Sequence, residues 1–291
     1  MKKKILFSLL SLVVCMFTMT ACSNDDDNNN GGGASGLKLT SVDWGDEVNG
    51  KCSYIYDEQG RIKKLSYSAR KDAYSATYDY QSNKIIVTTE GTYNGYWKNI
   101  TEYTLKDGVI TDGVVTDDEG EVIEKDEFSY KDGQLVSVME KEVGENGDTY
   151  EISINWKDGN IESYVSKRSR NSFSEQWQTT CQYTSESAVK GLVVCYTGIG
   201  FAFFEEKEDI LFKLGYFGKQ PKYLLSAIHK FSEQLRNDEN GNTYTYREER
   251  DQTYSYGFEG KDGYVSSRTV TEKNINFGEK EKTYVEKYTW E

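Results

Sequence analysis

The side chains that could carry chemistry in this sequence are mainly carboxylates. Its 291 residues include 48 Asp and Glu but a single histidine, His229. One histidine excludes a His-Glu-x-x-His metal site, and the sequence contains no nucleophile elbow, P-loop or dinucleotide fingerprint. Two carboxylates could hydrolyse a glycosidic bond if the fold held them at a suitable separation. A carboxylate-based hydrolase therefore stays open as one function, and we predict neither a cofactor nor a metal site.

Aromatic residues form a second group of candidates. Tyr93, Tyr96 and Trp97 surround an expected Asn-Gly turn, and Phe173 and Trp177 flank a polar stretch. Aromatic platforms suit flat ligands such as sugar rings, which offer an apolar face and polar edges. The competing interpretation is that Tyr93 and Tyr96 are only cross-strand partners beside the turn.

The N-terminus has the features of a targeting signal. Three lysines at positions 2–4 precede an apolar run over residues 5–17, which is too short to span a bilayer but typical of a signal peptide. Met19-Thr20-Ala21-Cys22 then resembles the lipobox of bacterial lipoproteins. The pattern predicts a signal peptide over residues 1–21 and a lipid-anchored, acylated Cys22. The alternative is an ordinary secreted protein with an incidental cysteine.

Residues 22–36 have the composition of a flexible tether. The stretch "SNDDDNNNGGGASG" is too rich in Asp, Asn and Gly to bury a core. The acidic cluster at positions 25–27 resembles the surface-export signal of Bacteroidetes-type lipoproteins. We therefore expect the protein to be anchored in the outer membrane and to face the cell surface. A solvated spacer on a protein facing the periplasm is the alternative.

The net charge of the chain argues against one class of partner, nucleic acid. The formal net charge is −13, whereas binding to phosphates needs clustered Lys and Arg, so nucleic acid is not an expected partner.

Besides Cys22, the mature chain has Cys52, Cys181 and Cys195. Cys181 and Cys195 flank an expected turn and could form a disulfide across a hairpin. Buried thiols are the alternative, because a small buried cysteine packs as a hydrophobe.

A repeated phrase dominates residues 37–291, which we expect to form a single β-rich domain. A bulky residue stands two places before a polar turn and recurs about every 25 residues, a period typical of an internal array. These residues are Tyr56, Tyr80, Leu105, Tyr130, Trp156 and Tyr183. Three of the turns read Lys-Asp-Gly, and Asp-Gly between alternating segments is a strong hairpin signal.

The hairpin register follows from these turns. If Asp and Gly are the two loop residues, the direct cross-strand pairs are Tyr80/Ile85, Leu105/Ile110, Tyr130/Leu135 and Trp156/Ile161. Such pairs stabilise a sheet by up to about 1 kcal/mol each. We expect all four pairs on one buried face, with Lys131 and Lys157 in solvent. The array predicts about 12 or more antiparallel strands in up-and-down order, forming a curved, barrel-like sheet.

The array is interrupted over residues 198–236. This stretch holds the chain's only proline, Pro221, and its only histidine. Leu224, Leu225, Ile228, Phe231 and Leu235 follow a helical spacing. We therefore expect a helical insert that packs on the sheet or plugs its open end. His229 falls on the polar face of the expected helix and should be solvated.

The phrase "YIYDEQGRI" at residues 54–62 is similar to the YD-repeat pattern. The chain over residues 37–291 resembles uncharacterised YD-like lipoproteins of Bacteroidetes, classed as a domain of unknown function with a porin-like fold. A "LGYLGK"-like segment of that pattern stands here at residues 214–219, with Phe217 in place of the second leucine. The resemblance implies a barrel-like antiparallel sheet and assigns no catalytic residue.

These observations favour a surface-anchored lipoprotein that works as a non-catalytic binding or adhesion module for a glycan or a protein. A structural component of an envelope complex and a carboxylate-based hydrolase are the alternatives.

Overall fold

The structure is a computed structural model. It describes residues 37–45, 50–69, 72–92, 95–145, 147–170, 173–188, 206–237, 243–259, 263–276 and 280–291. The contacts within the chain divide it into units 1–30 and 31–291, and all the described residues belong to the second unit. The predicted signal peptide, Cys22 and the tether lie outside the described residues. None of the described helices is long and apolar enough to cross a membrane.

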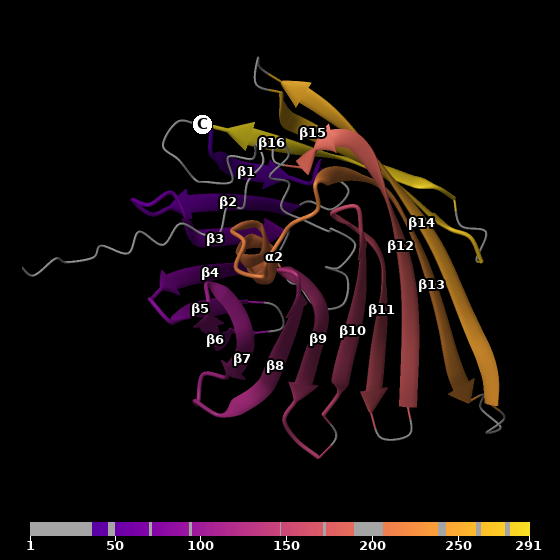
Figure 1. The fold of residues 1–291 in the computed structure, drawn as a ribbon, viewed down its shortest axis with the longest axis horizontal. Helices are drawn as coiled ribbons and strands as arrows, with labels where there is room; N and C mark the ends of the chain where they lie inside the picture. The colour runs from indigo at the N-terminus through magenta and orange to yellow at the C-terminus, as the bar shows by residue number, and fades with distance from the viewer. Residues whose placement is uncertain are drawn as a thin grey trace, which may run out of the picture. The chain divides into compact units, whose positions relative to one another are not determined.

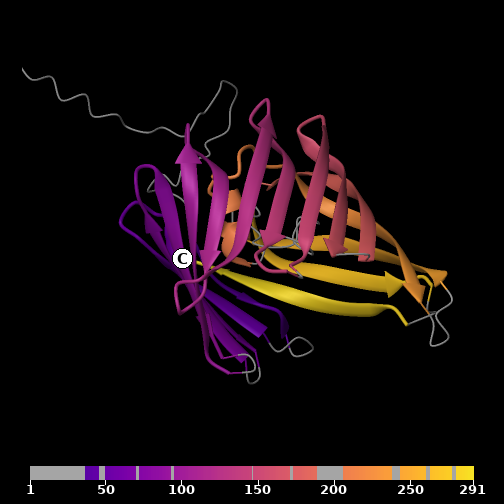
Figure 2. The same ribbon diagram turned by 90° about the horizontal axis from the view of Figure 1, so that it is seen from below.

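Within the described residues, sixteen strands form a closed antiparallel barrel (Figures 1 and 2). Each strand pairs with its neighbours in sequence, and β1 pairs with β16 to close the ring. The predicted up-and-down order is therefore confirmed. The strands are β1 (Leu39–Asp43), β2 (Gly50–Tyr56), β3 (Ile62–Ala69), β4 (Asp72–Tyr80), β5 (Lys84–Gly91), β6 (Trp97–Lys106), β7 (Val109–Thr116), β8 (Val122–Lys131), β9 (Gln134–Glu142), β10 (Thr149–Lys157), β11 (Asn160–Arg170), β12 (Phe173–Ser187), β13 (Tyr223–Asn237), β14 (Thr243–Glu259), β15 (Tyr264–Asn274) and β16 (Lys282–Trp290).

The Asp-Gly turns have the expected geometry. Asp107, Asp132 and Asp158 have φ of 52°, 54° and 52°, and the glycines that follow them also have positive φ. Positive φ at both loop residues defines the type I′ turn, whose twist matches that of the flanking strands. These turns therefore fix the hairpin register.

The four predicted cross-strand pairs are confirmed. Tyr80 pairs with Ile85, Leu105 with Ile110, Tyr130 with Leu135, and Trp156 with Ile161. The four aliphatic partners on the second strand of each hairpin are fully buried, and all eight residues belong to one hydrophobic core. The two lysines beside these turns, Lys131 and Lys157, are exposed as expected.

A bulge follows the aliphatic residue in most of these hairpins. In the β8–β9 hairpin Tyr130 pairs with Leu135 but Ser129 pairs with Ser137, so Val136 is the extra residue. A bulge leaves a main-chain group beside it without a ladder partner. The aromatic residue of the next repeat supplies that partner. Trp156 Nε1 donates to the carbonyl of Leu135 at 2.8 Å.

The same arrangement recurs around the ring, with donor–acceptor distances of 2.6–2.8 Å. The donors Tyr56, Tyr80, Tyr130, Tyr256 and Trp290 bind the carbonyls of Leu39, Ile62, Ile110, Leu225 and Val265, respectively.

Leu105 occupies the position that is aromatic in the other repeats, and the register of the preceding hairpin explains this difference. The preceding hairpin, β4–β5, pairs residue for residue from Tyr80–Ile85 to Tyr74–Gly91, without a register shift. The carbonyl of Ile85 therefore needs no side-chain donor, and the next repeat can carry leucine. The repeat thus encodes bulges as well as hairpins.

The prediction that Leu224, Leu225, Ile228, Phe231 and Leu235 lie on a helix within the insert was wrong, because these residues belong to strand β13. A bulge at Ser226 shifts the alternation by one residue, since Tyr183 pairs with Leu225 but Gln182 pairs with Ala227. Leu225 and Ile228 are then both buried at a spacing of three, which imitates a helix. Beyond Ile228 the inward face of β13 is polar, so the alternation typical of a strand is hidden as well.

The predicted insert does contain the helix α2 (Glu206–Lys213). Its Ile210, Leu211 and Phe212 are buried in the barrel core, and Figure 1 shows α2 surrounded by the strands. The segment after α2 closes over the hairpin turns: Lys219 N donates to Gly133 O at 2.8 Å, and Lys222 N to Gly159 O at 3.1 Å. Gly218 has φ of 83°, and a Cβ there would lie 2.5 Å from Gly133 O.

Candidate functional site

The barrel interior divides into an apolar part and a polar part. The buried hydrophobic side chains come largely from β1–β11 and α2. By contrast, many buried polar side chains lie on the last five strands: Glu175, Thr179, Ser232, Gln234, Gln252, Arg268, Asn274 and Glu286. Because a buried polar group is costly unless it is hydrogen-bonded, this polar interior is the part of the fold that packing alone does not explain.

Trp177 lies on the polar part of the interior. On β12, Glu175 and Thr179 are buried whereas Gln176 and Gln178 are exposed, so Trp177 shares the inward face. Its cross-strand neighbour on β13 is Ser232, which is 2% exposed. Ser232 Oγ has no hydrogen-bond partner among the described residues. A half-buried aromatic ring therefore adjoins a buried hydroxyl whose hydrogen-bonding capacity is unused.

Charged groups border this pair. Lys230 Nζ lies 5.8 Å from the centre of the Trp177 ring. Burial, helped by the positive charge of Arg250, lowers the pKa of Lys230. Arg250 in turn binds Glu248 at 2.8 Å and Glu272 at 3.0 Å. Asn274, opposite Arg250 in the sheet, has a buried Oδ1 without a hydrogen-bond partner among the described residues.

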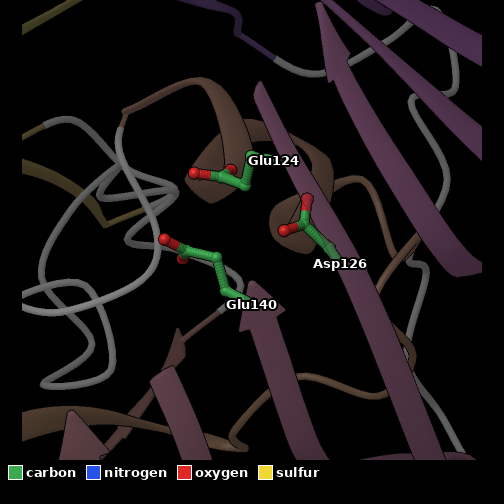
Figure 3. Close-up of side chains that lie close together, drawn as sticks. All are labelled: Glu124, Asp126 and Glu140. Atoms are coloured by element: carbon green, nitrogen blue, oxygen red, sulfur yellow. The ribbon is translucent and has the colours of Figure 1, made fainter. Parts of the chain in front are cut away.

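Three carboxylates meet on the inward face of β8 and β9. Figure 3 shows the carboxyl groups of Glu124, Asp126 and Glu140 turned towards one another. One oxygen from each lies within 4.8 Å of the others. Burial, then the negative charges of Glu124 and Glu208, raise the pKa of Asp126 to about 8. Burial, with Glu124 and Asp126, raises the pKa of Glu140 to about 9.

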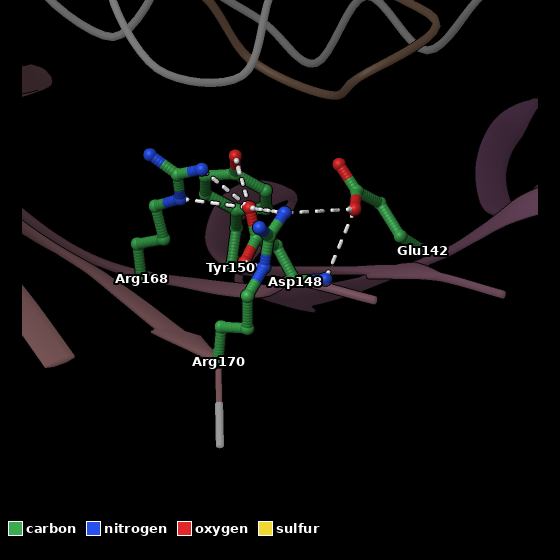
Figure 4. A network of polar contacts seen from close by, with 5 residues as sticks. All are labelled: Glu142, Asp148, Tyr150, Arg168 and Arg170. Carbon is green, nitrogen blue, oxygen red and sulfur yellow. Dashed lines mark hydrogen bonds and ion pairs between the residues drawn. The ribbon is translucent and has the colours of Figure 1, made fainter. Parts of the chain in front are cut away.

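An arginine network around Asp148 is shown in Figure 4. It involves β10 and β11, which lie between β9, the strand of Glu140, and β12, the strand of Trp177. Asp148 is 1% exposed and accepts hydrogen bonds from Arg168 Nε at 2.9 Å and Arg170 Nε at 2.6 Å. Burial opposes ionisation of Asp148, but the two guanidinium groups outweigh it and hold the pKa of that carboxyl below its usual range. Tyr150 pairs with Glu140 on one side and with Arg168 on the other, so it links the two regions.

The structure separates the aromatic residues predicted from sequence. Tyr96 is exposed, and its hydroxyl donates to Glu90 Oε2 at 3.3 Å. Trp97 pairs with Gly91, where a Cβ would lie 2.6 Å from the indole ring, so Trp97 packs on the glycine. Trp177 is on β12, far around the ring from β6. Tyr93 and the side chain of Phe173 lie outside the described residues.

The remaining predicted residues have mixed outcomes. Cys181 lies on β12 and is half-buried, whereas Cys195 is outside the described residues, so their disulfide stays a prediction. His229 lies on a strand and not on a helix, and its side chain is 43% exposed, which agrees with the expected solvation. Its Nδ1 lies 2.7 Å from Asp251 Oδ1.

Sequence reasoning missed Glu124, Asp126 and Glu140. Glu124 and Asp126 are two residues apart on one strand, which is a usable signal that they share a face. Glu140 was hidden by the bulge. Counting back from the Lys131/Gln134 pair without a bulge places Met139 opposite Asp126, whereas the bulge at Val136 places Glu140 there.

Comparison with known protein families agrees with the observed barrel fold. Residues 55–267 match the family described as "Domain of unknown function (DUF4595) with porin-like fold". The chain belongs to this family. No curated protein matches the sequence of this porin-like family member.

Two solved structures share its fold. A porin-like protein from Bacteroides uniformis superposes with a TM-score of 0.59 at 17% identity, covering 87% of this chain and 96% of the other. A porin-like protein from Bacteroides vulgatus gives a TM-score of 0.53 at 12% identity, covering 87% and 98%. At these identities the likeness concerns the fold alone.

Proposed function

We propose that this porin-like family member is a lipid-anchored envelope protein whose barrel is a non-catalytic binding module for a glycan. The observation that carries the proposal is Ser232, a buried hydroxyl with unused hydrogen-bonding capacity beside the Trp177 ring. Buried polar groups are nearly always hydrogen-bonded, so we infer that the Ser232 hydroxyl forms its hydrogen bond with a ligand. A sugar ring would stack on the indole, exchange hydrogen bonds with the Ser232 hydroxyl and accept one from the Lys230 ammonium.

The side chains on the barrel exterior favour a binding module and argue against a membrane-spanning pore. A barrel that spans a bilayer has an apolar band outside and a polar interior. Here the outward side chains of β8 and β10 are charged or polar and exposed: Lys125, Glu127, Ser129, Glu151, Ser153 and Asn155. The interior over β1–β11 is largely apolar and contains α2. The lipid anchor at Cys22 would then provide the attachment to the outer membrane, with the barrel at the cell surface or facing the periplasm.

The anchor is tested by metabolic labelling with a fatty-acid analogue. Label should appear on the wild type and be lost from Cys22→Ser. Equal labelling of both proteins would contradict the lipid anchor and leave the glycan proposal untouched.

The ligand is tested by a glycan array probed with the full chain. We expect binding to a restricted set of glycans, lost in Trp177→Ala and kept in Trp97→Ala, which removes a tryptophan that packs on Gly91. Silence across the array, together with a protein captured by the same chain, would favour a structural component of an envelope complex.

A hydrolase is the second candidate, and one observation favours it. Asp126 and Glu140 have strongly raised pKa values in the interior, and perturbed carboxylates cluster at active sites. Incubation with the array's glycans, followed by measurement of new reducing ends, tests it. If product forms with the wild type and not with Asp126→Asn, the barrel is an enzyme and not a non-catalytic binding module.

A further inference from the structure

We propose that Glu124, Asp126 and Glu140 bind a divalent cation of the size of Ca²⁺ on the interior face of β8 and β9. The inference does not depend on the glycan. The carboxyl groups come from neighbouring strands, since Asp126 pairs directly with Glu140 and Glu124 with Glu142. The strand ladder therefore fixes their positions, and Figure 3 shows the three groups converging.

Asp126 points to a ligand independently of the clustering. It is 8% exposed, and its Oδ1 is buried without a hydrogen-bond partner among the described residues. On the opposite strand stands Gly113, where a Cβ would lie 2.7 Å from Asp126 Oδ2. The glycine thus leaves room for the carboxylate, and Figure 3 shows the Asp126 carboxyl group turned towards Glu124 and Glu140.

The local charge also favours a cation. The carboxylates of Glu124 and Glu208 lie close enough to Asp126 to raise its pKa, and the ammonium of Lys207 opposes them. That ammonium is itself 3.4 Å from Glu208 Oε1. Buried negative charge must be neutralised by protons or by a cation, because isolated buried charges are very costly. A divalent ion would neutralise two of these carboxylates at once.

The ligand type and spacing select the ion. Three carboxylates offer only oxygen ligands, which suit hard cations. Ca²⁺ accepts variable oxygen geometry at roughly 2.3–2.6 Å, whereas Mg²⁺ demands near-ideal octahedral geometry at roughly 2.0–2.1 Å and keeps several of its waters. A site in which three protein carboxylates lie within 4.8 Å of one another therefore favours Ca²⁺.

The test is a titration of the chelator-treated full chain with CaCl₂ in about 0.15 M salt, an ionic strength that screens the acidic surface. Isothermal calorimetry measures Kd, and thermal unfolding measures the shift in Tm that a ligand of the folded state produces. We expect one saturable site in the wild type. Asp126→Asn and Glu140→Gln should each weaken Ca²⁺ binding at least tenfold. The matched control is Glu127→Gln on the outward face of β8, which should bind as the wild type does.

The same experiment can overturn the site. The proposal fails if the folded wild type shows neither heat nor a Tm shift up to about 10 mM CaCl₂, an affinity weaker than those of extracellular calcium modules. It also fails if Asp126→Asn and Glu140→Gln respond as the wild type does, since the ion would then be a diffuse counter-ion of the surface. Circular dichroism establishes that each variant is folded, and an equal response to MgCl₂ would contradict the assignment to Ca²⁺.

Discussion

The Tyr130 hydroxyl donates a hydrogen bond to the main-chain carbonyl of Ile110, 2.6 Å away and in the preceding hairpin. The relationship joins consecutive repeats through a bulge, because Thr111 is the extra residue that disturbs the ladder beside Ile110. An aromatic residue with a polar tip is thus required two places before the turn for two reasons. Its ring fills the core and its tip satisfies a buried carbonyl.

Removing only that hydroxyl should destabilise the barrel. Tyr130→Phe leaves the carbonyl of buried Ile110 without its partner, which should lower the free energy of unfolding by about 1–3 kcal/mol. Tyr96→Phe is the matched control, because the exposed Tyr96 hydroxyl binds a surface carboxylate, and it should leave the free energy of unfolding close to that of the wild type. Urea denaturation measures both. Equal effects would refute the role of the hydroxyl.

Much of this architecture could be predicted from the sequence, because its signals are local. Asp-Gly turns fix the register within two residues, and alternation assigns the faces. The bulges could not be predicted, because they depend on how one hairpin meets the next. That is why Glu140 opposite Asp126 was missed and why β13 was interpreted as a helix. Leu105 shows the reverse inference: leucine in the aromatic position marks a preceding hairpin without a bulge.

Acid should weaken the arginine network through Asp148. Its pKa is below the ordinary value, so its contribution to stability is complete above the unfolded-state pKa of about 4 and is lost as the pH falls through the lowered folded-state value. Asp148→Asn should cost about 1.5–3 kcal/mol at neutral pH, the range for hydrogen bonds to charged groups. The variant should lose part of the acid dependence of unfolding between about pH 5 and pH 2. A variant with the full wild-type dependence would contradict this assignment.

The buried ion pair of Arg268 and Glu286 should depend on both partners. Arg268 Nε and Nη2 donate to the two oxygens of Glu286 at 2.7 and 2.8 Å, and both side chains are almost fully buried. Glu286→Leu should cost about 3–5 kcal/mol, because it leaves a buried guanidinium without its counter-ion. The double variant Arg268→Met/Glu286→Leu should recover most of that loss. Additive losses in thermal unfolding would show that the two residues act independently.

The most direct measurement for the glycan-binding interior compares Ser232→Ala with the wild type in two readouts, stability and affinity for a glycan selected on the array. The Ser232 hydroxyl has no partner among the described residues, so its removal should leave the free energy of unfolding unchanged or slightly higher. If the hydroxyl instead serves a ligand beside Trp177, the same variant should bind the glycan about five- to tenfold more weakly, the loss of one net hydrogen bond of about 1 kcal/mol or slightly more. Unchanged affinity in a fully folded Ser232→Ala would contradict the proposal that this interior wall is the binding site.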